Sequence, residues 1–140
     1  MVKGGFFGIR SIMEDEDGYL WICNRKYKYN ILTDNTGTNA LNSINYQRGL
    51  GIERIESEDL YFLSMTLDDT GDLWMVTYDN GVWRRNGKEL IHYPVRDGEG
   101  DMLLSTICKD RQGELWVGTQ HDGVYRLRGD NFDKFVLRNE

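Results

Sequence analysis

Proline and cysteine are scarce in this sequence, and long apolar runs are missing. Its 140 residues include one proline, Pro94, but 16 glycines, a balance that fits many short strands joined by tight turns. No stretch approaches the roughly 20 apolar residues that a helix needs to cross a bilayer. The amino terminus also lacks an apolar stretch of signal-peptide length. We therefore expect either a cytoplasmic chain or one whose export signal lies outside this sequence.

A basic excess is also missing, since 17 Lys and Arg stand against 23 Asp and Glu, for a net charge of −6. Proteins that bind phosphate backbones normally carry a basic excess, so nucleic acid is not an expected partner. The two cysteines, Cys23 and Cys108, fall in apolar strand-like runs and do not make a disulfide framework. We expect two buried thiols that behave as small hydrophobic side chains.

A seven-residue unit of the form Asp-x-x-Gly-x-Leu-Trp occurs three times, at 15–21, 68–74 and 110–116. In the last two copies the unit is followed by Thr, by Gly-Val and by Arg at matching positions. Their glycines lie 42 residues apart, within the spacing of about 40–50 residues of a propeller blade. The recurring residues are Asp15, Gly18 and Trp21; Asp68, Gly71 and Trp74; and Asp110, Gly113 and Trp116.

The last two copies each predict four antiparallel strands joined by turns. Residues 73–76 are apolar at every position, which predicts a strand buried on both faces. Stacked four-stranded sheets with a tryptophan in each repeat indicate a β-propeller. We therefore predict an all-β fold of three four-stranded antiparallel blades. The expected strands lie at 63–67, 73–77, 82–85 and 90–93, then at 105–109, 115–119, 124–127 and 132–136, and the expected blades span about 6–58, 59–100 and 101–138.

The first copy is irregular, because Gly18 lies 53 residues before Gly71. The Gly-Val turn is missing, and a polar segment at 33–43 follows instead. This pattern predicts an enlarged loop within or after the first blade. Such an insertion either belongs to a binding surface or is a tolerated surface feature, and both interpretations stay open.

The third copy, from Ile107 to Arg126, resembles the two-component regulator propeller repeat. The second copy, from Met65 to Arg84, matches the pattern as well, and the first matches from Ile12 to Trp21 before it departs. The resemblance implies a non-enzymatic, extracytoplasmic (periplasmic) propeller in the sensor domain of a hybrid two-component sensor, often responsive to carbohydrate. A streptogramin-lyase-like propeller enzyme remains the alternative, because its repeats share a similar Asp-Gly-x-Leu-Trp core. A bare self-assembling scaffold is a third interpretation.

Three blades fall short of a complete ring, because natural propellers typically have about 4–8 blades. Two apolar faces would stay uncovered, so we expect further propeller blades as partners. Either they belong to the same chain of a larger protein, which the sequence favours, or copies of this chain assemble head to tail. In the second case two copies would give six blades.

Functional residues are expected in the loops between second and third strands and between blades, because these loops surround the mouth of a propeller channel. Polar groups beside tyrosine suit a sugar. No catalytic residue is assigned, since His121 as a base would need a titratable partner or a metal nearby. No metal or cofactor is expected, because calcium or zinc spacings are missing. The candidate ligand-binding residues are Arg25, Tyr27, Tyr78, Asp79, Asn80, Gln120, His121 and Asp122. The recurring Asp and Gly are expected to form turns, and the recurring Trp to pack between blades.

Overall fold

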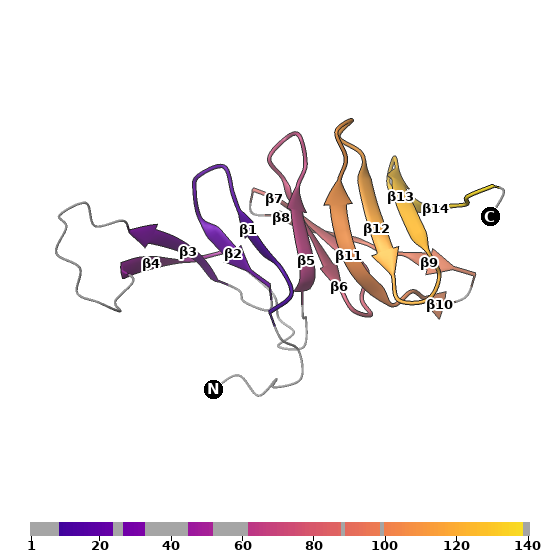
Figure 1. Ribbon diagram of the computed structural model, residues 1–140, viewed down its shortest axis with the longest axis horizontal. Helices are drawn as coiled ribbons and strands as arrows, with labels where there is room; N and C mark the ends of the chain where they lie inside the picture. Colours follow the sequence, from indigo (N-terminus) through magenta and orange to yellow (C-terminus); the bar gives the residue numbers. More distant parts are fainter. Residues whose placement is uncertain are drawn as a thin grey trace.

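The computed structural model describes residues 9–23, 27–32, 45–51, 62–87, 89–98 and 100–138. Every regular element in these ranges is a β-strand, so the predicted all-β fold is confirmed. The same ranges hold no helix of the length and apolarity required to traverse a bilayer. The strands form three four-stranded antiparallel sheets, which lie beside one another as blades of a partial propeller (Figure 1).

Each blade is a meander in which the strands pair in sequence order. Blade 1 contains β1 (Ile12–Glu14), β2 (Leu20–Ile22), β3 (Tyr27–Leu32) and β4 (Asn45–Leu50). Blade 2 contains β5 (Phe62–Leu67), β6 (Leu73–Thr77), β7 (Val82–Asn86) and β8 (Glu89–Tyr93). Blade 3 contains β11 (Leu104–Lys109), β12 (Leu115–Thr119), β13 (Val124–Arg128) and β14 (Asn131–Phe135). A short hairpin of β9 (Arg96–Asp97) and β10 (Gly100–Asp101) lies between blades 2 and 3, where the sequence predicted only a loop.

The meander sorts the connections to two ends of the blades. One end, here the Asp-turn end, holds the turns between first and second strands and those between third and fourth strands. The other end, here the mouth end, holds the turns between second and third strands and the connections between blades, including the β9–β10 hairpin. In Figure 1 the Asp-turn end points up and this hairpin lies low at the right.

The irregular first copy carries its extra length inside blade 1. Strand β3 ends at Leu32 and β4 begins at Asn45, and these two residues pair with each other. The intervening segment lies outside the described residues, but its two attachment points are at the Asp-turn end. The insertion therefore starts and finishes at the end opposite the candidate ligand-binding turns.

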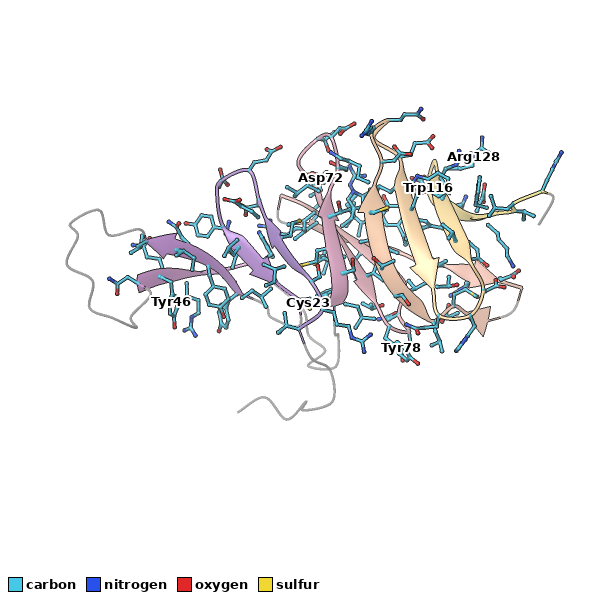
Figure 2. The ribbon with its side chains drawn as sticks, viewed as in Figure 1. Cys23, Tyr46, Asp72, Tyr78, Trp116 and Arg128 are labelled. Carbon is cyan, nitrogen blue, oxygen red and sulfur yellow. The ribbon has the colours of Figure 1, made fainter. Side chains whose placement is uncertain are left out.

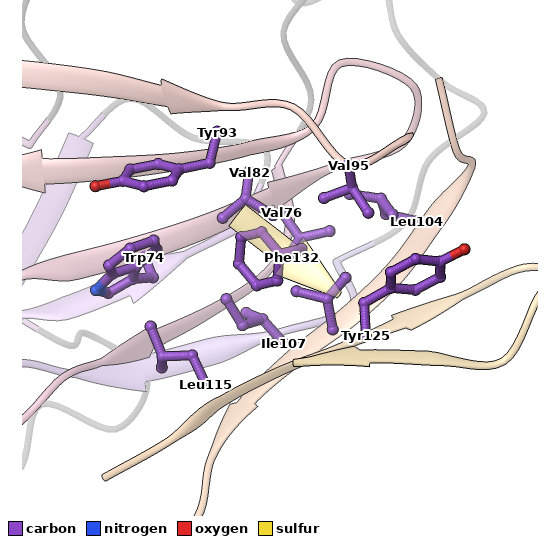
Figure 3. Close-up of a cluster of buried hydrophobic side chains, with 11 residues drawn as sticks. Trp74, Val76, Val82, Tyr93, Val95, Leu104, Ile107, Leu115, Tyr125 and Phe132 are labelled. Atoms are coloured by element: carbon purple, nitrogen blue, oxygen red, sulfur yellow. The ribbon is translucent and has the colours of Figure 1, made fainter. Parts of the chain in front are cut away.

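Strand β6 is buried along its whole length, as the unbroken apolar run predicted. Trp74 and Val76 point toward blade 3, whereas Leu73 and Met75 point toward blade 1. Blade 2 is therefore covered by a sheet on each face. The larger cluster, between blades 2 and 3, joins Trp74, Val76, Val82 and Tyr93 to Val95, Leu104, Ile107, Leu115, Val117, Tyr125 and Phe132 (Figure 3). The smaller cluster, between blades 1 and 2, contains Trp21, Cys23, Phe62, Met65, Leu73 and Met75.

The recurring aspartate organises the Asp-turn of each blade. In blade 2, Asp68 Oδ1 accepts hydrogen bonds from the backbone N–H groups of Thr70 and Asp72, and Oδ2 accepts one from Trp74 Nε1 at 2.8 Å. The same indole bond measures 2.7 Å in blade 1 and 2.9 Å in blade 3. The glycine three residues after the aspartate has a φ of 84° in blade 2, where an L side chain would be strained. Turn and tryptophan are thus fixed by one carboxylate.

A cation lies over the tryptophan ring in every blade. The guanidinium carbons of Arg84 and Arg126 are 5.2 and 5.5 Å from the ring centroids of Trp74 and Trp116. Lys28 takes this place in blade 1, 5.8 Å from the Trp21 ring. Arg84 also forms an ion pair with Asp72, with 2.6 Å between Nη2 and Oδ2. The arginine that recurs after the Gly-Val turn therefore covers the tryptophan and anchors to the Asp-turn.

The cysteine prediction holds for one residue and is wrong for the other. Cys23 is buried and accepts backbone N–H bonds from Arg10 and Ser11 at 3.0 and 3.2 Å. Cys108 is exposed. It pairs with Trp116 and so shares the face of blade 3 that no described sheet covers. Both thiols are free.

Replacement of Trp74 by alanine should lower the free energy of unfolding by about 3–5 kcal/mol, because a large side chain that is 2% exposed leaves a cavity between two sheets. Trp116→Ala is the matched control, since the same ring in blade 3 is only partly buried. Urea unfolding followed by circular dichroism measures both changes. Equal losses in the two variants, measured at a concentration where the chains are monomeric, would contradict burial between the blades of one chain as the source of stability.

The free energy of unfolding should also decrease as the pH is lowered, because Asp68 becomes protonated. Burial disfavours its charged form, but hydrogen bonds from Thr70 and Trp74 outweigh this and lower the pKa of Asp68 below its usual value. A lowered folded-state pKa gives stability that is complete above the unfolded value, about 3.9, and is lost as the pH falls through the folded value.

The Asp68→Asn variant should therefore lose about 1–3 kcal/mol at neutral pH, because its amide N–H₂ would face another donor, Trp74 Nε1. Its free energy of unfolding should also change less between pH 5 and 3 than that of the unaltered chain. Urea titrations across this range measure both effects. Asp130→Asn, at an exposed turn position, is the control, and an equal flattening of its pH profile would refute the assignment.

Candidate functional site

Two turns at the mouth end are held by a recurring threonine. Thr77 Oγ1 donates to the carbonyl oxygen of Gly81 at 2.7 Å and accepts from the backbone N–H of Asn80 at 2.9 Å. Thr119 makes the same two bonds with Gly123 and Asp122, both at 2.8 Å. These threonines recur in the sequence, yet only the geometry shows that they fix the turns that carry the candidate residues.

The turn of blade 2 also requires its glycine. Gly81 has a φ of 70°, and a Cβ atom there would lie 2.6 Å from the carbonyl oxygen of Tyr93. The turn is therefore pressed against the end of the outermost strand of its own blade. His92 lies in that strand with an exposed side chain, and its Nε2 is 2.8 Å from the carbonyl oxygen of Asn80.

Gln120 is occupied in holding the blade together. Its side-chain amide donates to the carbonyl oxygen of Leu104 at 3.1 Å and to Ser105 Oγ at 2.7 Å. A neighbouring backbone bond runs from Leu104 N to the carbonyl oxygen of Tyr78 at 2.8 Å and joins blade 3 to blade 2. The amide of Gln120 thus bonds to the first two residues of β11, and its N–H groups are not available to a ligand.

Asp122 is occupied as well. Its carboxylate accepts from the hydroxyl of Tyr125 at 2.7 Å and from Lys134 Nζ at 2.8 Å. The hydrogen bond from Lys134, followed by that from Tyr125, lowers the pKa of Asp122. Burial of the Tyr125 phenol, with the nearby Asp122 charge, raises the pKa of Tyr125. Asp122, Tyr125 and Lys134 thus bond to one another, with Asp122 charged and Tyr125 protonated at neutral pH.

The remaining mouth-end candidates are open to solvent. The side chains of Asp79, Asn80 and His121 are exposed and make no hydrogen bond or ion pair with the described part of the chain. Tyr78, beside them in the blade 2 turn, is 37% exposed. Figure 2 shows Tyr78 at the mouth end and Asp72 at the Asp-turn end. Adjacent turns of two blades therefore present a phenol, a carboxylate, an amide and an imidazole.

The first-copy candidates do not join this group. Tyr27 lies in strand β3 and not in a loop, and the guanidinium carbon of Arg48 is 4.3 Å from the centroid of its ring. Arg25 lies outside the described residues. Within the described ranges no three His, Cys, Asp or Glu side chains come together as a metal would require.

Known proteins match this chain in part. A family model described as two component regulator propeller matches residues 8–26 and 98–121, which include the first and third Asp-turns. The second copy, which has the same sequence pattern, lies outside these two ranges. No curated protein matches the chain.

A solved structure with a similar fold is the extracellular domain of a putative hybrid two component system from B. thetaiotaomicron. It superposes with a TM-score of 0.55 at 21% sequence identity, over 83% of this chain. The chain spans only 14% of the length of that protein, so the likeness concerns a small part of it. With the stacked meanders and the Asp–Trp turns described above, these matches show a propeller fold in which the first and third repeats match the two component regulator propeller model.

Proposed function

We propose that the chain is a sensing module of a hybrid two-component system and that it works outside the cytoplasm. The observation that carries the proposal is the match of the regulator propeller model to the first and third repeats. The fold it shares with an extracellular domain of such a system supports the same placement. Because the chain spans only 14% of that domain, the sensing role we propose is that of a module within a larger sensor.

The proposed ligand-binding surface is the mouth end, at the turns 78–81 and 120–123. Asp79, Asn80 and His121 supply hydrogen-bond donors and acceptors that no described residue uses, and Tyr78 supplies a partly exposed ring. Sugars need both kinds of contact, since their hydroxyl groups require hydrogen bonds and their apolar faces lie against aromatic rings. A carbohydrate is therefore the proposed class of ligand.

Binding without catalysis is the role we assign to these turns. A general base must lie within hydrogen-bond reach of the group it deprotonates and is usually held by a second polar group. His121, the one histidine in the mouth-end turns, has no such partner among the described residues. The neighbouring carboxylate in its own turn, Asp122, is already engaged by Lys134 and Tyr125.

Asp79→Ala and His121→Ala should each weaken carbohydrate binding roughly tenfold or more, because hydrogen bonds that involve charged or strongly polar groups contribute about 1.5–3 kcal/mol. The probes are soluble neutral and acidic oligosaccharides, screened singly against the immobilised chain and then titrated by calorimetry. Asp130→Ala removes the same charge from the opposite end of blade 3 and should bind like the unaltered chain.

Two outcomes would count against the proposal. Retention of full affinity by the Asp79→Ala/His121→Ala double variant would exclude the mouth end as the binding surface. Hydrolysis or elimination products in the oligosaccharide mixtures that disappear in His121→Ala would instead favour a lyase-like enzyme.

A further inference from the structure

Two sheet faces of the described chain remain open, one on each terminal blade. On blade 3 the open face carries Trp116, Val124 and Phe135, and the latter two are 40% and 43% exposed. On blade 1 the open face carries Ile12, Leu20 and Ile22, with Ile12 64% exposed. All six residues pair with a residue of a neighbouring strand, so their exposure is not that of unpaired loops.

The open face of blade 3 repeats the covered face of blade 2. Strand pairing places Trp116 where blade 2 has Trp74, and Phe135 where blade 2 has Tyr93. Tyr93 is 7% exposed and its ring centroid lies 4.9 Å from that of Trp74. Phe135 makes the same contact with Trp116, at 5.1 Å, but stays uncovered. The open face of blade 3 therefore has the same arrangement as the face of blade 2 against which blade 3 packs.

The open face of blade 1 repeats the side of blade 3 that covers blade 2. Ile12 and Ile22 pair as Ile107 and Val117 do. In blade 3 these two residues are 4% and 0% exposed, because they lie against Trp74 and Val76. The terminal blades therefore carry the two complementary halves of the internal interface.

Charged residues on the open faces are complementary in the same register. Inside the chain, Asp69 of the blade 2 turn forms an ion pair with Lys109 of blade 3, with 2.9 Å between Oδ1 and Nζ. The residue of blade 3 equivalent to Asp69, two before the turn glycine, is Arg111. The residue of blade 1 equivalent to Lys109, four before the turn glycine, is Glu14. Both signs are reversed, so the pair remains attractive.

A second position shows the same complementarity. Within the chain, Ile91 on the covered face of blade 2 packs against the cluster that contains Phe132 of blade 3. Strand pairing makes Asp133 the equivalent of Ile91, and Arg48 the equivalent of Phe132. An apolar pair inside the chain thus corresponds to one acidic and one basic residue on the two open faces. Arg111, Glu14, Asp133 and Arg48 are all exposed, and none has an ion-pair partner in the described ranges.

The backbone offers a third matching contact. Ser64 Oγ of blade 2 accepts the backbone N–H of Ile107 in blade 3 at 3.1 Å. Thr106 is the residue of blade 3 equivalent to Ser64, and Ile12 of blade 1 is equivalent to Ile107. Thr106 is exposed and carries the hydroxyl that this contact requires.

We infer that the open face of blade 3 binds the open face of blade 1 of a second copy of this chain, so that two chains close head to tail into a ring of six blades. Six lies within the range of about 4–8 blades in natural propellers. Apolar packing drives the association, and the two charge pairs set which faces meet. The inference does not depend on carbohydrate binding and can be tested in its absence.

The test is the oligomeric state of the 140-residue protein, measured by sedimentation equilibrium over a range of concentrations. The expected mass is that of two chains. Glu14→Arg and Arg111→Glu should each weaken association roughly tenfold, because an attractive pair becomes a repulsive one at both interfaces of the ring. The double variant Glu14→Arg/Arg111→Glu restores opposite signs and should recover most of the affinity. Asp130→Arg, which changes a charge away from both faces, should leave it unaltered.

Far-UV circular dichroism and tryptophan fluorescence establish that each variant is folded. A folded chain that stays monomeric at all concentrations would overturn the inference, and the faces would then serve other blades of a longer protein. Polymers of indefinite length would overturn the closed ring. Association that the double variant does not restore would overturn the assignment of these two faces.

Discussion

The structure depends on burying a tryptophan side chain between two sheets while its indole N–H group keeps a hydrogen-bond partner. A buried donor without a partner costs about 1–3 kcal/mol, which would offset much of what burial of the ring contributes. The carboxylate of Asp68 removes this cost with a 2.8 Å bond to Trp74 Nε1, and its other oxygen organises the turn before the strand. Seven residues therefore determine a turn, the orientation of a strand and the contact with the next blade. This is why the unit can recur while the residues around it change.

Much of the fold could be predicted because the interactions that build it are local or periodic. The apolar run at 73–76 predicted a strand covered on both faces, and β6 is such a strand. The β9–β10 hairpin has strands of two residues each, too short to leave a pattern. Cys108 shows another limit, because strand periodicity assigns a residue to a face but does not reveal whether a neighbouring sheet covers that face.

The candidate site was less predictable, because the availability of a polar side chain depends on partners far away in the sequence. Loop position correctly marked the turns at 78–81 and 120–123. It could not show that Gln120 is bound to Leu104 and Ser105, or that Asp122 is bound to Lys134. The sequence predicts a loop at Tyr27, because the Gly-Val turn of the other two copies is missing there, but Tyr27 lies in β3. What remained after the internal bonds were identified is the smaller group around Asp79 and His121.

The two ends of the blades differ in how their polar groups are used. At the Asp-turn end the recurring carboxylates accept hydrogen bonds from backbone amides and indoles, so substitution there acts on stability. At the mouth end, Thr77 and Thr119 fix the turns of blades 2 and 3 through backbone groups, which leaves side chains such as Asp79 and His121 unconstrained. The exposed residues of such turns can therefore be substituted without unfolding the blade. Ring closure by a second copy would repeat this surface around the axis and bring two sets of these groups to one channel mouth.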